Sequence, residues 1–201
     1  MKNLNRGIKF VPIQLTHAKL FVFVDGSFAN NKDLSSQIGF VIVLANESMK
    51  NDEFSLYGNL IHWTSVKCKR VTRSVLASEL YAMVLGADIA NALSTTLNMI
   101  TNQLCINNIP TIICTGSFSL YECMVKLGTT KEKRLMIDIM AIRQSYERRE
   151  LSEIRWICGT DNPADAMTKA NPSKALEGLI NTNSLRIRIQ GWVQRHKNEE
   201  S

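Results

Sequence analysis

Hydrophobic and polar positions change their spacing along the chain, and each spacing predicts a different element. Before residue 70, apolar residues form short β-rich runs joined by short polar connections, which is typical of an antiparallel meander. From residue 74 to 97 the apolar positions recur at near-helical spacing in Ala-rich sequence without proline, which predicts a long helix. The three predicted strands lie at residues 19–25, at 37–44 and around 60–63.

The second half of the chain alternates between the two kinds of pattern. Pro110 precedes a short apolar strand at 111–115, and Ser117 is a candidate N-cap for a helix that ends at Gly128. A further helix is predicted at 131–149, a fifth strand at 153–158, a helix start near Pro163 and a short helix at 174–180, followed by an amphipathic or extended tail. This order, βββαβαβα, predicts an α/β fold with a mixed five-stranded sheet, three antiparallel strands then two parallel, flanked by helices.

Composition narrows the class of protein. The chain has 201 residues, of which 45% are hydrophobic and 21% charged, which suits one globular domain and argues against disorder. Its longest apolar runs are too short to cross a bilayer, and residues 1–20 have no signal-peptide pattern. The five cysteines form no CxxC pair, which favours thiols in a reducing compartment over zinc or disulfides. We therefore expect an intracellular protein, cytoplasmic or nuclear, without a membrane partner.

Three carboxylates stand at informative positions in this predicted fold. Asp25 closes the first strand, Glu79 lies in the first turns of the long helix, and Asp165 opens the final helix. If they converge at one end of the sheet, hard cations such as Mg²⁺ or Mn²⁺ would offset their repulsion, and two such ions can activate water for phosphodiester cleavage. The alternative interpretation is that each acid is merely solvated or caps a helix.

Four linked motifs carry a family resemblance. The stretches FVDGSFANN, HWTSVKCKRVTRSVLASELYA, ICTGSFSL and NPADAMTK, in this order and spacing, resemble the ribonuclease H domain of fungal copia-type LTR retrotransposon polyproteins. The resemblance extends over nearly the whole chain, including RLMIDIMAIRQSYERRE and the tail with GWVQR. It implies three regions: a lead-in from the polymerase connection at 1–18, a ribonuclease H-like domain at 19–170 and a C-terminal helical extension at 171–201.

The resemblance also implies a site. Ribonuclease H domains hold two divalent ions with an Asp–Glu–Asp–Asp quartet and cut the RNA strand of an RNA–DNA hybrid. By motif, Asp25 matches the first Asp, Glu79 the Glu and Asp165 the last Asp, each as both catalytic residue and metal ligand. The third Asp normally follows the fourth strand in the triplet TDS, but here the triplet is TGS and Gly116 stands in its place.

The loss of this carboxylate predicts an impaired site, because glycine offers neither a ligand nor a charge. Two acids nearby in the sequence are candidate substitutes. Glu122 is six residues downstream on a predicted helix and is expected to point elsewhere, and Asp161 lies on the loop before the last motif. We expect weakened binding of Mg²⁺ or Mn²⁺.

A basic cluster precedes the long helix. Lys67, Lys69, Arg70 and Arg73 lie together with no acid between residues 64 and 78, in a chain with net charge +6. In the ribonuclease H fold this segment flanks the carboxylates, so contact with the phosphates of a hybrid is the functional interpretation and a solvated loop is the alternative. The cations of the 131–149 helix are instead expected to form a solvated face.

Two main hypotheses follow, with a weaker third. The chain is a metal-dependent endonuclease for RNA–DNA hybrids, working with the reverse transcriptase region of the same polyprotein. Alternatively, it is a non-catalytic relic or a domesticated nucleic-acid-binding domain with the same fold, which Gly116 favours. An integrase-like nuclease is the third, although the LASELYA helix and NPADAMTK argue against it.

Overall fold

The structure is a computed structural model, and it describes residues 7–125, 130 and 132–194. The strands are β1 (Ala18–Ser27), β2 (Gln37–Lys50), β3 (Glu53–Lys67), β4 (Thr111–Thr115), β5 (Glu153–Ile157) and β6 (Ser184–Gln194). The α-helices are α1 (Val75–Gln103), α2 (Phe118–Val125), α3 (Met136–Glu147) and α4 (Ala175–Thr182). Short 3-10 turns include η3 (Gly159–Asp161) and η4 (Pro163–Met167), both between β5 and α4. The predicted helix end at Gly128 lies outside the described residues.

The first five strands have the predicted pairing. β1, β2 and β3 form an antiparallel meander, β4 pairs parallel with β1, and β5 pairs parallel with β4. The predicted total of five strands is wrong, because β6 pairs antiparallel with both β3 and β5 and closes the sheet into a barrel in the order β1-β2-β3-β6-β5-β4.

The region expected as a helical extension, 171–201, thus contains one helix, α4, and one strand. The strand had a signal in the sequence. Leu185 and Ile187 are buried and alternate with Arg186 and Arg188, which is the period-two pattern of a half-buried strand. Residues 195–201 lie outside the described part of the chain.

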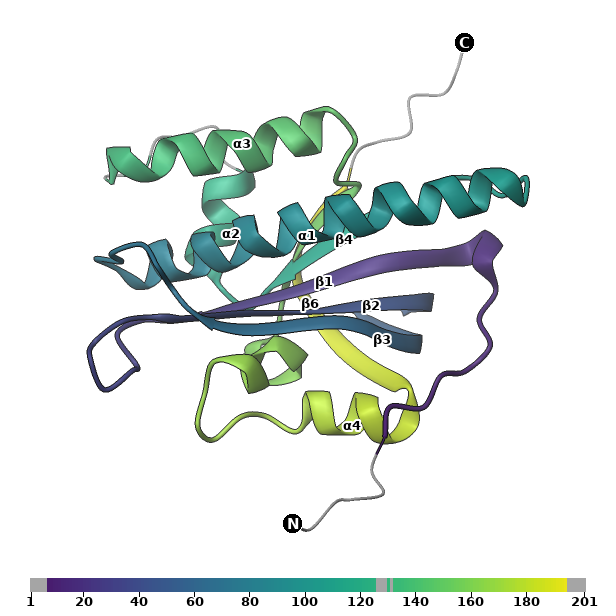
Figure 1. Ribbon diagram of the computed structural model, residues 1–201, viewed down its shortest axis with the longest axis horizontal. Helices are drawn as coiled ribbons and strands as arrows, with labels where there is room; N and C mark the ends of the chain where they lie inside the picture. The colour runs from purple at the N-terminus through teal and green to yellow at the C-terminus, as the bar shows by residue number, and fades with distance from the viewer. Residues whose placement is uncertain (1–6, 126–129, 131, 195–201) are drawn as a thin grey trace.

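Alternation along β1 separates two apolar cores. Leu20, Val22 and Val24 belong to the core on the side of α1, while Phe21 and Phe23 belong to the core on the opposite side, which includes Leu179 of α4. Figure 1 shows the same layers: α1, α2 and α3 cover one side of the sheet and α4 lies on the other. Because side chains alternate across a strand, Asp25 follows Phe23 onto the α4 side.

The long helix α1 begins at a conventional cap. The Ser74 side chain accepts a hydrogen bond from the Ala77 N–H at 3.2 Å, and the helix then runs six residues beyond the predicted end at Leu97. Among the described residues, α1 is the one helix that is long and apolar enough to cross a membrane, judged by length and composition alone. Half of its most apolar window is buried inside the protein, so this property carries no membrane assignment.

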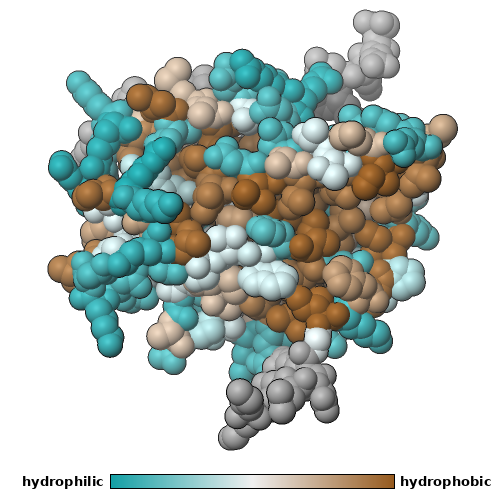
Figure 2. Space-filling view, in the orientation of Figure 1, coloured by the Kyte–Doolittle hydropathy of each residue, from teal (hydrophilic) through white to brown (hydrophobic). Residues whose placement is uncertain are grey.

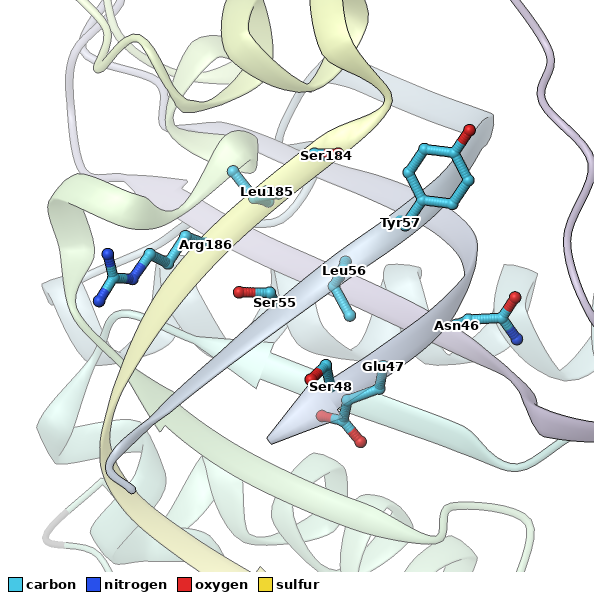
Figure 3. Close-up of a pocket in the computed structure, with 9 residues that line it drawn as sticks. All are labelled: Asn46, Glu47, Ser48, Ser55, Leu56, Tyr57, Ser184, Leu185 and Arg186. Atoms are coloured by element: carbon cyan, nitrogen blue, oxygen red, sulfur yellow. The ribbon is translucent and has the colours of Figure 1, made fainter. Parts of the chain in front are cut away.

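A buried ion cluster lies at the end of the sheet far from Asp25. Arg155 on β5 is fully buried, and its guanidinium contacts the carboxylates of Glu47 and Glu153, while Lys19 Nζ lies 2.6 Å from Glu47 Oε2. A pocket of about 490 Å³ opens beside Glu47 between β2, β3 and β6 (Figure 3). Its two charged lining residues, Glu47 and Arg186, are both engaged in ion pairs with other side chains of the protein.

Candidate active site

Asp25 and Gly116 occupy neighbouring positions at the same edge of the sheet. The parallel pairing of β1 with β4 places Val24 opposite Thr115, so the next residue on each strand is Asp25 and Gly116, respectively. By alternation along the strands, Asp25 lies on the same face of the sheet as Phe23, and Gly116 on the same face as Cys114. Phe23 and Cys114 belong to the same apolar core, so Asp25 and Gly116 share one face. The structure therefore places Gly116 beside Asp25.

Glu79 reaches this edge from the second turn of α1. The Gly26 N–H, one residue after Asp25, donates a hydrogen bond to the Glu79 carboxylate. A Cβ at Gly26 would lie 2.5 Å from the backbone of Ser78, so only glycine permits β1 and α1 to approach this closely. Glu79 Oε2 is buried without a hydrogen-bond partner. Burial, and then the negative charge of Asp25, raise the pKa of Glu79 to about 8.

Asp165 is held on η4, a short 3-10 turn rather than the start of the final α-helix as predicted. The Asn162 side chain fixes this turn to the sheet: its Nδ2 donates to the Val24 carbonyl at 2.9 Å and its Oδ1 accepts from the Ala164 N–H at 3.1 Å. Asp165 Oδ2 accepts a hydrogen bond from the Ser173 N–H at 2.7 Å. The turn ends at Met167 because the chain must then cross to α4, which begins at residue 175.

Gly39 gives η4 room to lie against the sheet. It pairs with Asp25 across β1 and β2, and a Cβ there would lie 2.3 Å from Met167 Cβ and 3.0 Å from the Thr64 carbonyl oxygen. Because real Cβ atoms do not approach backbone or side-chain atoms this closely, a larger residue would push η4, and Asp165 with it, away from Asp25. Sequence reasoning missed this glycine, since nothing local marks it.

Thr168 and Lys169, the two residues that follow η4, also contact the carboxylates. The Thr168 hydroxyl donates a hydrogen bond to Asp25 Oδ2, and the Lys169 ammonium donates to Asp165 Oδ1 and lies 4.0 Å from Asp25 Oδ1. Burial raises the pKa of Asp25, against the opposing effects of Thr168 and Lys169, and the charge of Asp165 raises it further. Neither residue was singled out from the sequence, although both belong to the NPADAMTK motif.

The structure brings the three carboxylates to one place, and they are nearly buried: the whole-residue exposed fractions are 7% for Asp25, 8% for Glu79 and 5% for Asp165. Their oxygen ligands suit Mg²⁺ or Mn²⁺. Nevertheless, no group of three or more His, Cys, Asp or Glu side chains within the described residues is arranged to hold a metal ion. The Asp25 and Asp165 oxygens face the chain's own donors instead. The residues present therefore do not fit the two-ion site that the resemblance implies.

Neither candidate substitute supplies the missing carboxylate. The two Asp161 oxygens accept hydrogen bonds from Arg188 on β6, each at 2.9 Å, and this contact lowers the pKa of Asp161. Glu122 lies within α2, beyond the turn that follows β4. A Cβ at position 116 would lie 3.3 Å from Gly159 Cα, a tight contact that needs a small shift of Gly159, and 3.8 Å from Asn162 Nδ2. The backbone φ of Gly116 is not positive.

The basic cluster lies where Figure 2 shows hydrophilic side chains gathered, at the left edge beside the start of α1. Lys67 contacts Asp33, and Arg70 pairs with Asp138 of α3 at 2.9 Å and lies 4.9 Å from the centre of the Tyr81 ring. All four cations, Lys67, Lys69, Arg70 and Arg73, are exposed. Lys67 and Arg70 thus have ion-pair partners that the sequence pattern did not indicate, and the charge of Arg73 acts on Glu132.

No family model matches the chain, and no curated protein sequence is similar to it. Solved structures do share its fold. The RNase H1 named LC11, isolated from compost by a metagenomic approach and solved with an RNA/DNA hybrid, has a TM-score of 0.51 and 19% identity over 79% of this chain and 99% of that one. RNase H1 of the halophilic archaeon Halobacterium salinarum has a TM-score of 0.53 and 13% identity over 79% and 98%. An RNase H domain from Mycobacterium tuberculosis has a TM-score of 0.50 and 15% identity over 80% and 95%. The chain therefore has an RNase H-like fold, and its described residues form a mixed six-stranded sheet flanked by four α-helices.

Proposed function

We propose that this chain is the ribonuclease H domain of a copia-type LTR retrotransposon polyprotein, which binds RNA–DNA hybrids and hydrolyses their RNA strand slowly. One observation carries the proposal: β1, α1 and η4, far apart in the sequence, bring Asp25, Glu79 and Asp165 together beside position 116. The solved RNase H1 with an RNA/DNA hybrid supports the substrate class. Divalent Mg²⁺ or Mn²⁺ is the cofactor that the resemblance implies. Because the residues present do not fit a two-ion site and position 116 is glycine, we expect one ion at most, bound weakly.

The cellular context of this proposal comes from the sequence motifs alone. They point to the reverse transcriptase region of the same polyprotein as the partner, to a role in reverse transcription, and to a cytoplasmic or nuclear location without a membrane.

A second candidate function is a non-catalytic relic or domesticated domain that binds hybrids through its basic surface. Gly116 and Lys169 favour it. The first removes a carboxylate, and the second brings a positive charge against Asp165 where a divalent ion would otherwise be attracted. The two candidates differ in whether the remaining site can still support hydrolysis.

Restoring the carboxylate at position 116 tests the proposal. Gly116→Asp should raise metal-dependent cleavage of an RNA–DNA hybrid by about 10²–10³-fold, since loss of one preorganised electrostatic group costs this much in other enzymes. The space around Gly116 requires Gly159 to shift by only a few tenths of an ångström. Gly116→Asn is the matched control, because it adds the same volume without the charge and should not raise the rate.

Two outcomes would contradict this account. Robust wild-type cleavage that Asp25→Asn abolishes would show that another group replaces the missing Asp and that Gly116 is not limiting. A folded Gly116→Asp protein that binds hybrid but gains no activity would favour the non-catalytic candidate.

A further inference from the structure

The ammonium of Lys169 is the positive charge nearest the carboxylates of the candidate site. It contacts Asp165 Oδ1 and lies 4.0 Å from Asp25 Oδ1, although about half of the Lys169 side chain is exposed. The side chains of Asp25 and Asp165 are only 10% and 8% exposed. A charge that reaches from solvent to two buried acids acts on them in a medium where water screens little.

The backbone fixes the lysine at this position. The Lys169 N–H donates to the Asp165 carbonyl at 3.2 Å, so the chain makes one further turn after η4 and the two side chains lie on the same face, four residues apart. The neighbouring donors complete the arrangement. The Ser173 N–H donates to the second oxygen of Asp165, and the Thr168 hydroxyl donates to one oxygen of Asp25.

Asp25 and Asp165, buried without a cation, would repel each other and would lose hydration. In this chain, donors from residues 168–173 occupy both oxygens of Asp165 and one of Asp25, and the remaining Asp25 oxygen faces Lys169. The chain thus compensates these charges with its own groups. A divalent ion would have to displace the ammonium before it could contact Asp25 and Asp165 together.

We propose that Lys169 is a built-in counter-ion of the carboxylate site, which holds η4 against the sheet without a divalent ion and competes with one for Asp25 and Asp165. The inference concerns the site of the proposed function, but it needs neither cleavage nor a bound hybrid. Lys169 is a positioning residue in this account, because it acts through the two carboxylates.

Lys169→Met tests the proposal, since it keeps the apolar stem of the side chain and removes the charge. In EDTA the variant should unfold at a lower temperature than the wild type. Added Mn²⁺ should restore the variant and leave the wild type nearly unchanged. Mn²⁺ affinity, measured by electron paramagnetic resonance, should rise about tenfold in the variant, equivalent to about 1.4 kcal/mol. Lys50→Met, at an exposed lysine at the end of β2, is the matched control and should change neither property.

A double-variant comparison separates charge compensation from packing. If Lys169 acts on Asp165, the loss of stability from Lys169→Met should largely disappear in an Asp165→Asn background. Equal losses in both backgrounds, an unchanged Mn²⁺ affinity, or a Lys169→Met protein that fails to fold even with Mn²⁺ would each overturn the proposal. Hybrid cleavage enters none of these readouts, so this inference and the proposed function can fail separately.

Discussion

Glu79 is held in surroundings that oppose its charge. It is nearly buried, one of its oxygens has no hydrogen-bond partner, and Asp25 carries a like charge nearby. These conditions raise its pKa from 4.5 to about 8, although the Gly26 N–H acts in the opposite direction. At neutral pH the folded protein therefore retains a proton that the unfolded chain releases, and this difference links the site to stability.

Glu79→Gln should make stability less dependent on pH. In the wild type, the retained proton contributes fully to the free energy of unfolding below about pH 4.5. This contribution is lost as the pH rises to about 8, and the free energy of unfolding falls by up to about 1.4 kcal/mol for each pH unit. Asp25, whose pKa is also raised, adds a change of the same sign, so the variant should keep part of the slope. Urea unfolding in EDTA at several pH values measures both slopes, and equal slopes would contradict the assigned pKa.

Some site residues were predictable from the sequence and others were not. Asp25 and Glu79 follow a recognisable strand and a recognisable helix start, so their convergence could be argued from element order. Gly39 and Lys169 act through contacts with segments that are distant in the sequence or defined only by the turn at η4. Local patterns do not encode such contacts, and only the packed structure shows why these residues are there.

At the scale of elements, the position of η4 decides whether the site forms. η4 carries Asp165, and it lies against β1 and β2 because Gly39 has no side chain. Asn162 fastens its start to β1 through the Val24 carbonyl. The element has no long hydrogen-bonded helix to stabilise it, so its placement depends on these few contacts.

Gly39→Ala should therefore destabilise the protein and displace η4. Overpacking at a tight contact costs about 1–3 kcal/mol, and here the added methyl group would overlap Met167. Chemical denaturation measures the change in the free energy of unfolding. Hydrogen exchange at the Thr168 and Lys169 amides, which donate to the Asp165 carbonyl, should show whether η4 is displaced.

Gly178→Ala is the control for a change from glycine to alanine. Gly178 lies in α4 with no atom within 4 Å of an added Cβ, so alanine there should stabilise the helix by about 0.5–1 kcal/mol. Loss of stability in both variants, or in neither, would show that the contact with Met167 does not position η4.

The strand β6 shows where prediction of elements reached its limit. The meander, α1 and β4 have strong local patterns, and the bounds of β1 and β4 were predicted within two residues. β2 runs six residues beyond its predicted end, β3 extends well beyond residues 60–63 on both sides, and α1 also runs further. β6 has a period-two pattern as well, but it pairs with β3 over its first part and with β5 over its second. Closure of a barrel by one strand against two distant partners is a property of the whole sheet, and an alternating pattern alone does not specify the partners.

At the scale of the whole molecule, positive charge lies beside the carboxylate edge. Lys67 at the end of β3 and Lys69, Arg70 and Arg73 on the connection to α1 carry this charge. Glu79 lies in the second turn of α1. Two of these cations have acidic partners, Asp33 and Asp138. Exposed ion pairs contribute about 0–1 kcal/mol, so exchanging these partners for phosphates costs little.

Hybrid binding should therefore be salt-dependent through this cluster. For the wild type in EDTA, which prevents metal-dependent cleavage, affinity should fall steeply between about 50 and 200 mM salt as the neutralised phosphates release counterions. Replacing Lys67, Lys69, Arg70 and Arg73 by Ala should reduce the log–log slope by about 0.9 for each phosphate that the variant no longer neutralises. The matched control replaces four other exposed cations, Lys9, Lys50, Arg148 and Lys174, and lowers the net charge from +6 to +2 in the same way. If both quadruple variants show the same reduced slope, binding follows net charge alone and the cluster is not the interface. If the slope is reduced only in the variant of the cluster, the hybrid binds beside the carboxylates.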